Sequence, residues 1–477
     1  MKKLISILTS SVLVMSTSIL LVSCIAQGAK PSPLTIGNEI KKVDGAANYK
    51  NGTNHPNKDS KFTNYFIIGD SLSDVDGLSK MLNEKTKFDI SGLNVDFSSL
   101  SPLMPVPNKV LNIKTDINLS LGNDEIGDEG YGFKSKDGKW HSSFSNGETA
   151  GYLLNEKLGF GEMESSNPFS KGTIKKNNRN YSIGGATASN ALNTTSSLIL
   201  DDVTVDKQAR ALISQHHVEQ TNNDLVFFEI GGNDLFALGG LDPNDTKTQN
   251  KVIEESMQKI RLTLFTLLNN GIENIIVGTP PDVSTVPRYG NANDKTLKYL
   301  AKTSARYHSE MLKVIEEVQK YYPNQIQIYD IYEEFEGLKD RHEIEYNKDK
   351  SKEEFVTTNK DKAFTDSMKF KGNGEIELTA KTIVTTTKIK LLTFDSEKGG
   401  LIITKPSVPE LLAFGLAKTI DVSLSANMAM IPFRNQDGVE KPIDIDSYFF
   451  TDIVHPTRLV HKLVSEDLFE LSKKFEN

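Results

Sequence analysis

The residues best suited to chemistry are one serine near the start of the chain and an Asp–His pair near its end. Ser71 follows the short apolar run Tyr65–Ile68, so we expect it where a buried strand ends and a helix begins. A hydroxyl at a helix N-terminus can attack a substrate while the adjacent N–H holds the oxyanion that forms. The alternative is a simple turn followed by a helix cap, which this stretch by itself favours.

Asp452 and His455 lie three residues apart, directly before a predicted helix. Pro456 disfavours helical backbone angles at His455, so the imidazole can project from a loop. A carboxylate three residues earlier can accept the ring Nδ1–H, fix the tautomer and stabilise the imidazolium. The alternative is a capping aspartate beside a surface histidine. We interpret the neighbouring His216 and His217 as surface residues and not as a metal site, because no third ligand is apparent.

Two further predicted strand ends carry groups that can hold a developing negative charge. Asn180–Thr187 is a short strand that ends in paired glycines, and Asn233 follows the best strand of the chain, Asp224–Ile230. A simple turn is the alternative for the glycines, and the spacing of a dinucleotide-binding motif is absent. Because ligands bind at the carboxyl ends of parallel strands, we expect Ser71, Gly185 and Asn233 at the same edge of a sheet.

The elements that must position these residues alternate along the chain as strand and helix, which predicts an α/β fold with helices on both faces of a parallel sheet. The further strands that we expect are Asn274–Gly278 and Gln325–Ile331; the expected helices are Leu72–Leu82, one beginning at Ser145–Glu148, Val252–Asn269, about Leu297–Tyr322 and one after Thr457.

Two segments interrupt this alternation and are predicted to be insertions. Residues 83–140 have weak periodicity and lie next to Ser71 in sequence. Residues 336–446 contain a predicted hairpin, Ile376–Thr404, and an apolar stretch, Leu411–Phe433, that is either a helix over the site or a core segment. The second insertion is therefore either an added subdomain or a lid.

The composition fits a soluble globular body. The 477 residues carry a net charge of −8, which gives no electrostatic footprint for nucleic acid. The one cysteine, Cys24, excludes an intrachain disulfide and a cysteine metal cluster.

Cys24 ends an apolar run, Leu4–Val22, that two lysines precede, and this pattern resembles a bacterial lipobox. We therefore predict a lipoprotein signal peptide over residues 1–23, a lipidated Cys24 that begins a flexible tether over 24–61, and a folded body over 62–476. The chain is then anchored to the extracytoplasmic face of a bacterial membrane. A plain signal peptide or a single membrane helix is the alternative.

Four short blocks, in this order, resemble those of the GDSL lipases, or SGNH hydrolases. The blocks are Gly69–Leu72, Gly184–Thr187, Gly231–Asp234 and Asp452–Thr457. The serine lacks the Gly-x-Ser-x-Gly elbow of α/β-hydrolases, which fits this family and not that one. The resemblance implies a three-layer α/β/α fold with a mostly parallel, flavodoxin-like sheet, interrupted by the two insertions.

The resemblance also implies roles for the residues introduced above. Ser71 is the nucleophile, His455 takes and returns its proton, and Asp452 orients His455. The oxyanion hole comprises the Ser71 N–H, the Asn233 amide and a glycine N–H, which we align at Gly185. Gly184 is the alternative donor, and Asp70 and Asp74 are expected to shape the turn.

The reaction implied is ester hydrolysis through an acyl-serine, without metal or cofactor. Since a lipid anchor places the enzyme beside bilayers, the expected substrates are lipids or (lyso)phospholipids. The alternatives are a short-chain or carbohydrate esterase and a non-catalytic surface lipoprotein that binds ligands.

Overall fold

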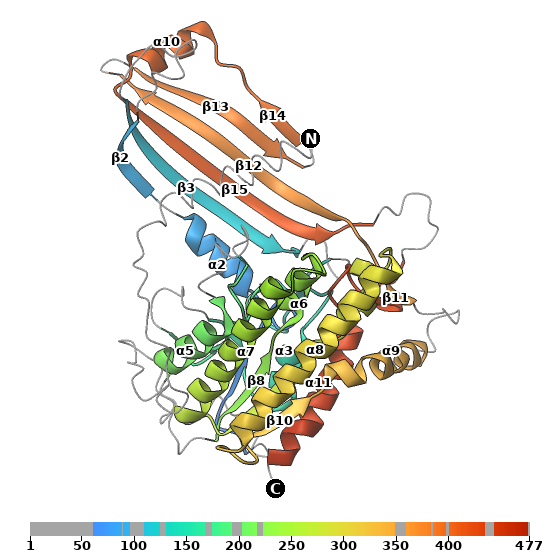
Figure 1. The fold of residues 1–477 in the computed structure, drawn as a ribbon. Helices are drawn as coiled ribbons and strands as arrows, with labels where there is room; N and C mark the ends of the chain where they lie inside the picture. Colours follow the sequence, from blue (N-terminus) through green and yellow to red (C-terminus); the bar gives the residue numbers. More distant parts are fainter. Residues whose placement is uncertain are drawn as a thin grey trace. The chain divides into compact units, whose positions relative to one another are not determined.

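The structure is a computed structural model of the chain (Figure 1). It describes residues 61–87, 89–95, 109–124, 130–166, 174–192, 203–216, 223–348, 359–382, 385–396, 400–434 and 443–475. The predicted signal peptide, Cys24 and nearly all of the predicted tether lie outside these residues. The described chain forms two compact units. Residues 61–78, 122–367 and 432–475 form the parallel-sheet unit, and residues 79–121 with 368–431 form the mixed-sheet unit.

The parallel-sheet unit is built on six strands in the order β10-β9-β8-β1-β7-β6, and every neighbouring pair is parallel. The strands are β1 (Tyr65–Ile68), β6 (Glu164–Ser165), β7 (Asn178–Asn180), β8 (Leu225–Glu229), β9 (Asn274–Gly278) and β10 (Ile326–Tyr329). Strands β1, β8 and β9 are buried along their whole length, as expected for short apolar runs covered on both faces.

Helices flank this sheet in two groups (Figure 1). One group comprises α5 (Val205–Gln215), α6 (Gly232–Gly239), α7 (Thr246–Asn269) and α8 (Asp294–Gln319), which pack side by side. The other comprises α3 (Ala150–Lys157), α9 (Ile331–Asn347) and α11 (Arg458–Ser472). Alternate residues of β1, Tyr65 and Ile67, join one core cluster with Leu154 of α3 and Leu468 of α11. The predicted three-layer α/β/α arrangement is confirmed.

Shorter elements complete this unit. They are β4 (Phe133–Lys134), β5 (Trp140–His141), β11 (Asn359–Ala363), β16 (Tyr448–Phe450) and the 3₁₀ turns Val283–Thr285, Pro287–Tyr289, Ile445–Ser447 and Lys473–Phe475. Strand β16 precedes the predicted Asp–His pair and pairs with β11. Strand β16 therefore fixes where the loop with Asp452 and His455 leaves the core.

The mixed-sheet unit unites parts of both predicted insertions in one six-stranded sheet, ordered β14-β13-β12-β15-β3-β2. Its elements are β2 (Asp89–Val95), β3 (Lys109–Leu121), β12 (Met368–Lys381), β13 (Thr386–Asp395), β14 (Gly400–Ile403), α10 (Val408–Leu416) and β15 (Thr419–Pro432). Strand β15 pairs in parallel with β3, from Thr419 opposite Val110 to Met430 opposite Leu121. The two sequence segments are therefore parts of one body.

Two local predictions are wrong, and for a third segment one of its two alternatives is wrong. The helix after Ser71 is α2 (Gly77–Thr86), so the serine lies in a turn and not at a helix start. The helix expected from Ser145 begins at Ala150. Leu411–Phe433 is not a single helix but the end of α10 followed by strand β15; Phe414, Ala417 and Ile420 of this stretch do join a buried core cluster, as the alternative of a core segment predicts.

Candidate active site

Ser71, His455 and Asp452 form a hydrogen-bonded chain in the parallel-sheet unit. His455 Nε2 lies 2.8 Å from Ser71 Oγ, and His455 Nδ1 lies 2.7 Å from Asp452 Oδ2. Ser71 and Asp452 are buried, while the His455 side chain is 14% exposed. Because the ring bridges a hydroxyl and a carboxylate, it can accept the hydroxyl proton while the carboxylate stabilises the imidazolium.

Ser71, Gly185 and Asn233 follow three neighbouring strands, β1, β7 and β8. The structure therefore places all three beyond the carboxyl ends of the central strands, where parallel sheets bind ligands. Asn233 lies in the first turn of α6 and donates through Nδ2 to Ala186 O at 3.0 Å. The same Nδ2 lies 3.4 Å from Asp70 Oδ2.

The two glycines after β7 have different surroundings. The Gly184 N–H donates to Asp74 Oδ2 at 2.5 Å, and a Cβ at this position would meet the Phe144 ring at 2.3 Å. Gly185 has a φ of 82°, a left-handed conformation that glycine adopts without strain. Within the described part of the chain, its N–H has no hydrogen-bond acceptor. Gly185 is therefore the better placed of the two to serve an oxyanion.

Asp74 fixes the turn that carries Ser71. Its carboxylate accepts the N–H groups of Gly77 at 2.6 Å and Leu78 at 2.9 Å, in addition to that of Gly184. Burial raises the pKa of Asp74 to about 7, although the three hydrogen bonds oppose this shift. One side chain thus ties the serine turn, the start of α2 and the glycine pair together.

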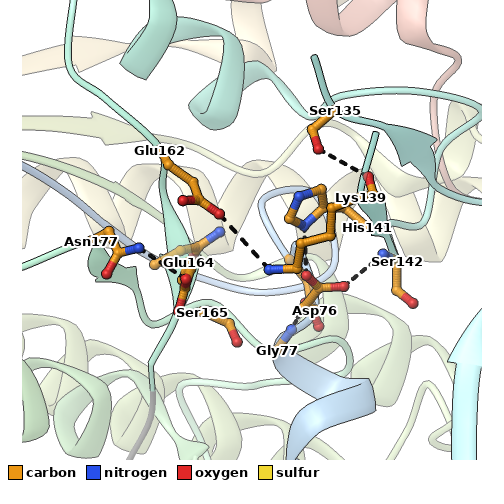
Figure 2. Close-up of polar contacts among 12 residues, drawn as sticks. Asp76, Gly77, Ser135, Lys139, His141, Ser142, Glu162, Glu164, Ser165 and Asn177 are labelled. Carbon is orange, nitrogen blue, oxygen red and sulfur yellow. Dashed lines mark hydrogen bonds and ion pairs between the residues drawn. The ribbon is translucent and has the colours of Figure 1, made fainter. Parts of the chain in front are cut away.

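Asp76, which follows the serine turn in the sequence, is held by contacts with His141 and Ser142 (Figure 2). Its carboxylate accepts the Ser142 N–H at 2.7 Å and contacts His141 Nδ1 at 2.7 Å. The Asp76 N–H donates to Ser142 O at 2.9 Å. Asp76 has a φ of 62°, which costs free energy for a non-glycine residue, and these three bonds offset that cost.

Asp452 receives hydrogen bonds at both carboxylate oxygens. Oδ1 accepts the N–H groups of Val454 at 2.7 Å and His455 at 2.8 Å. Oδ2, which contacts the His455 ring, also accepts the Tyr131 hydroxyl. Burial raises the pKa of Asp452, but the nearby His455 and these hydrogen bonds outweigh it, so the pKa lies below its ordinary value. The carboxylate is therefore charged wherever histidine titrates.

Two aromatic residues to which the sequence assigns no role contact the Asp452–His455 pair. Phe144 stacks on His455 with ring centroids 4.8 Å apart, and it also contacts Tyr131. Burial and the neighbouring Asp452 raise the pKa of Tyr131 well above its ordinary value, so its hydroxyl remains a donor. No local motif marks Tyr131, which lies 321 residues before Asp452.

Three buried carboxyls, Asp70, Glu229 and Asp234, lie at or shortly after the ends of β1 and β8 in the sequence. The Asp70 N–H donates to Glu229 Oε1 at 3.3 Å, and both side chains are buried. Burial raises the pKa of Asp70 and of Glu229, and their mutual repulsion raises that of Glu229 further. Burial also raises the pKa of Asp234, whose carboxylate accepts the N–H groups of Ala188 and Ser189. These carboxyls hold the loops that follow β1 and β7 through hydrogen bonds to backbone N–H groups.

The interpretation of His216 as a surface residue is wrong. His216 is buried, its Nε2 lies 2.9 Å from Asn178 O, and its ring contacts Phe66. His217 lies outside the described residues. His308 contacts Asp330 at 2.9 Å, so further Asp–His pairs exist that sequence spacing did not indicate. Its partner comes 22 residues later, at the end of β10.

Searches for a metal cluster and for a membrane-crossing helix were negative over the residues that the structure describes. No group of three or more His, Cys, Asp or Glu side chains there is arranged to hold a metal ion. None of the helices in those ranges has the length and apolar character needed to cross a bilayer.

Comparison with known protein families identifies the fold's relatives. The family described as GDSL-like Lipase/Acylhydrolase matches residues 65–468, a range that contains Ser71, Gly185, Asn233, Asp452 and His455. A search of curated protein sequences gives no match.

Proposed function

The chain belongs to the GDSL-like lipase/acylhydrolase family, and from this premise we propose that it hydrolyses acyl esters with Ser71 as nucleophile. The family supports a hydrolase of the esterase or lipase type in general. The observation that carries the specific proposal is the His455 ring, which lies within hydrogen-bond distance of both Ser71 and Asp452.

In the first half of the reaction, Ser71 Oγ attacks the ester carbonyl carbon and His455 Nε2 takes the hydroxyl proton. The carbonyl oxygen becomes an oxyanion that accepts hydrogen bonds from the Ser71 and Gly185 N–H groups and from Asn233 Nδ2. His455 then gives its proton to the leaving alcohol, and an acyl-serine remains.

In the second half, a water molecule replaces the alcohol. His455 takes a proton from the water as it attacks the acyl carbon, and it returns the proton to Ser71 Oγ as the acid leaves. Asp452 stays charged throughout and stabilises the imidazolium that forms in each half.

We further propose that the substrate is a lipid or a (lyso)phospholipid and that the enzyme is anchored through Cys24. The support is the single cysteine at the end of an apolar run near the N-terminus. An anchored enzyme meets acyl esters at the bilayer surface in high local concentration.

The test has two steps. A fluorophosphonate should label the wild-type chain and leave Ser71→Ala unlabelled; equal labelling of both would exclude Ser71 as nucleophile. Hydrolysis of lysophospholipid, diacyl phospholipid, p-nitrophenyl acetate and acetylated sugar is then compared. A preference for the last two would assign a short-chain or carbohydrate esterase, and no hydrolysis of any ester would favour a binding protein.

A further inference from the structure

The mixed-sheet unit has an unusual apolar surface at α10 and β14. Nine large hydrophobic side chains are exposed in the described parts of the chain, and five of them lie within this short stretch. Ile402 and Ile403 are consecutive in β14, so their side chains point to opposite faces of the sheet. The other three, Val408, Leu412 and Leu416, lie on α10, and we call them the α10 patch; their exposed fractions run from 62% to 78%. Contiguous exposed apolar residues mark interaction surfaces more often than isolated ones do.

Helix α10 exposes apolar residues to water, whereas an ordinary surface helix buries them. Val408, Leu412 and Leu416 recur every four residues, so they share one face, and that face is exposed. The buried contacts with the sheet come from Phe414 and Ala417. An ordinary surface helix of a globular protein presents polar residues to water.

The one carboxylate of α10 is held at the start of the helix. Glu410 is the single charged residue of α10, and its carboxylate accepts the Ser407 N–H at 2.6 Å and the Ser407 hydroxyl at 2.7 Å. It is therefore held in the capping box at the helix start. The α10 patch faces water without a carboxylate of its own.

Positive charges border the patch at both ends of the helix. Lys405 and Lys418 are exposed, and neither forms an ion pair within the ranges that the structure describes. An aliphatic face flanked by ammonium groups complements a surface whose interior is apolar and whose rim carries phosphates.

The composition of the patch distinguishes a lipid surface from a protein partner. Protein interfaces are enriched in aromatic residues, methionine and arginine, and they are depleted in lysine. The α10 patch contains three aliphatic side chains and its border contains lysines. A bilayer with anionic headgroups matches this composition better than a second copy of the chain does.

We propose that α10 forms a membrane-contact site that lies on bilayers containing anionic phospholipid, with Leu412 and Leu416 at the acyl boundary. This site acts separately from any anchor at Cys24, and it concerns binding and not hydrolysis. Because it is argued from the mixed-sheet unit by itself, it stands independently of the proposed esterase activity.

The experiment compares full-length variants that all carry Cys24→Ser, so that acylation cannot contribute and residues 1–61 otherwise stay the same. Partition onto phosphatidylcholine–phosphatidylglycerol vesicles is measured by co-sedimentation. Leu412→Asp is compared with Ile344→Asp on α9, because these aliphatic residues are 62% and 60% exposed. We expect Leu412→Asp to lower the partition coefficient by about tenfold or more, and Ile344→Asp to leave it unchanged.

A second pair of measurements tests the charges. Lys405→Glu with Lys418→Glu should weaken binding to the mixed vesicles by about fivefold or more and leave binding to pure phosphatidylcholine unchanged. Thermal unfolding checks that each variant is folded. Ser71→Ala should bind vesicles like the parent, which separates this proposal from the catalytic one.

Two results would overturn the proposal. The first is equal vesicle binding by the parent and the folded Leu412→Asp variant. The second is a shift from dimer to monomer in Leu412→Asp, seen by analytical ultracentrifugation, without a change in vesicle binding. That outcome would assign the α10 patch to contact between copies of the chain.

Discussion

Replacement of Asp452 by asparagine tests how the proposed catalytic residues act together. Its Oδ1 accepts two backbone N–H groups, from Val454 and His455, at 2.7 and 2.8 Å. An asparagine keeps these bonds when its carbonyl oxygen occupies the Oδ1 position. Its NH₂ group then faces His455 Nδ1 and the Tyr131 hydroxyl.

This orientation inverts the histidine tautomer. Because the amide donates, His455 Nδ1 must accept, and the ring proton moves to Nε2. Nε2 lies 2.8 Å from Ser71 Oγ, so the nitrogen that should take the hydroxyl proton already carries one. The same replacement in the serine-protease triad lowers kcat about 10⁴-fold. We expect a similar loss here, equivalent to about 5 kcal/mol of transition-state stabilisation.

The assay is the steady-state hydrolysis of p-nitrophenyl acetate, with thermal unfolding as a check on folding. The matched control is Asp467→Asn. Like Asp452, Asp467 accepts a tyrosine hydroxyl, that of Tyr329 at 3.0 Å, and it also forms an ion pair with Arg341 that the replacement removes. The control should retain activity within about threefold, as expected for a site remote from the reaction. If folded Asp452→Asn keeps more than about a tenth of the wild-type kcat, the proposed role of Asp452 in setting the tautomer is wrong.

Three further predictions follow from the surroundings of the site. Tyr131→Phe removes one hydrogen bond to the charged carboxylate of Asp452. The kcat should therefore fall roughly tenfold, and the acid limb of the pH–rate profile should move to higher pH. An acid limb that does not move would leave Tyr131 with a structural role only. Asn233→Ala should lower kcat by about 10²–10³ with little change in KM, because it removes one proposed oxyanion donor; a loss confined to KM would contradict this. Burial raises the pKa of Glu229 and of Asp70, so the native state keeps protons that the unfolded chain releases. The free energy of unfolding should therefore decrease as pH rises from about 4, the ordinary carboxyl pKa, to about 6, the pKa of Asp70 in the folded state, by up to about 1.4 kcal/mol per pH unit for each proton. Glu229→Gln should flatten this dependence in chemical denaturation, and parallel curves for the two proteins would refute the assignment.

The sequence predicts the fold well where local patterns are strong. Short apolar runs bounded by glycine and polar residues correspond to strands: Tyr65–Ile68 and Asn274–Gly278 are β1 and β9 to the residue. Such runs are buried on both faces, so apolar composition and strand position coincide.

Predictions fail where distant contacts decide the local structure. The sequence predicts a helix that begins at Ser145–Glu148, but Asn146 Oδ1 accepts the Arg458 N–H, and its Nδ2 donates to Asp446. These partners are about 300 residues away. The helix therefore begins four residues after Asn146, at Ala150, and no local rule reports that competition.

The same limit applies to β15. Its apolar residues alternate with Ser, Asn and Asp, but the stretch also contains alanine and methionine, which favour helices. The strand forms because β3 pairs with it in parallel along twelve positions. Since β3 lies some 300 residues earlier, the Leu411–Phe433 sequence does not reveal its partner.

The positions of the proposed oxyanion donors follow from one buried side chain. Asp74 accepts N–H groups from the start of α2 and from Gly184, so the loops after β1 and β7 cannot move independently. Asp74 takes the Gly184 N–H, whereas the Gly185 N–H has no acceptor among the described residues. Donors that are fixed before the reaction need no reorganisation as charge develops, which is what makes such a site effective. A residue that never touches the substrate can therefore determine which glycine serves the oxyanion.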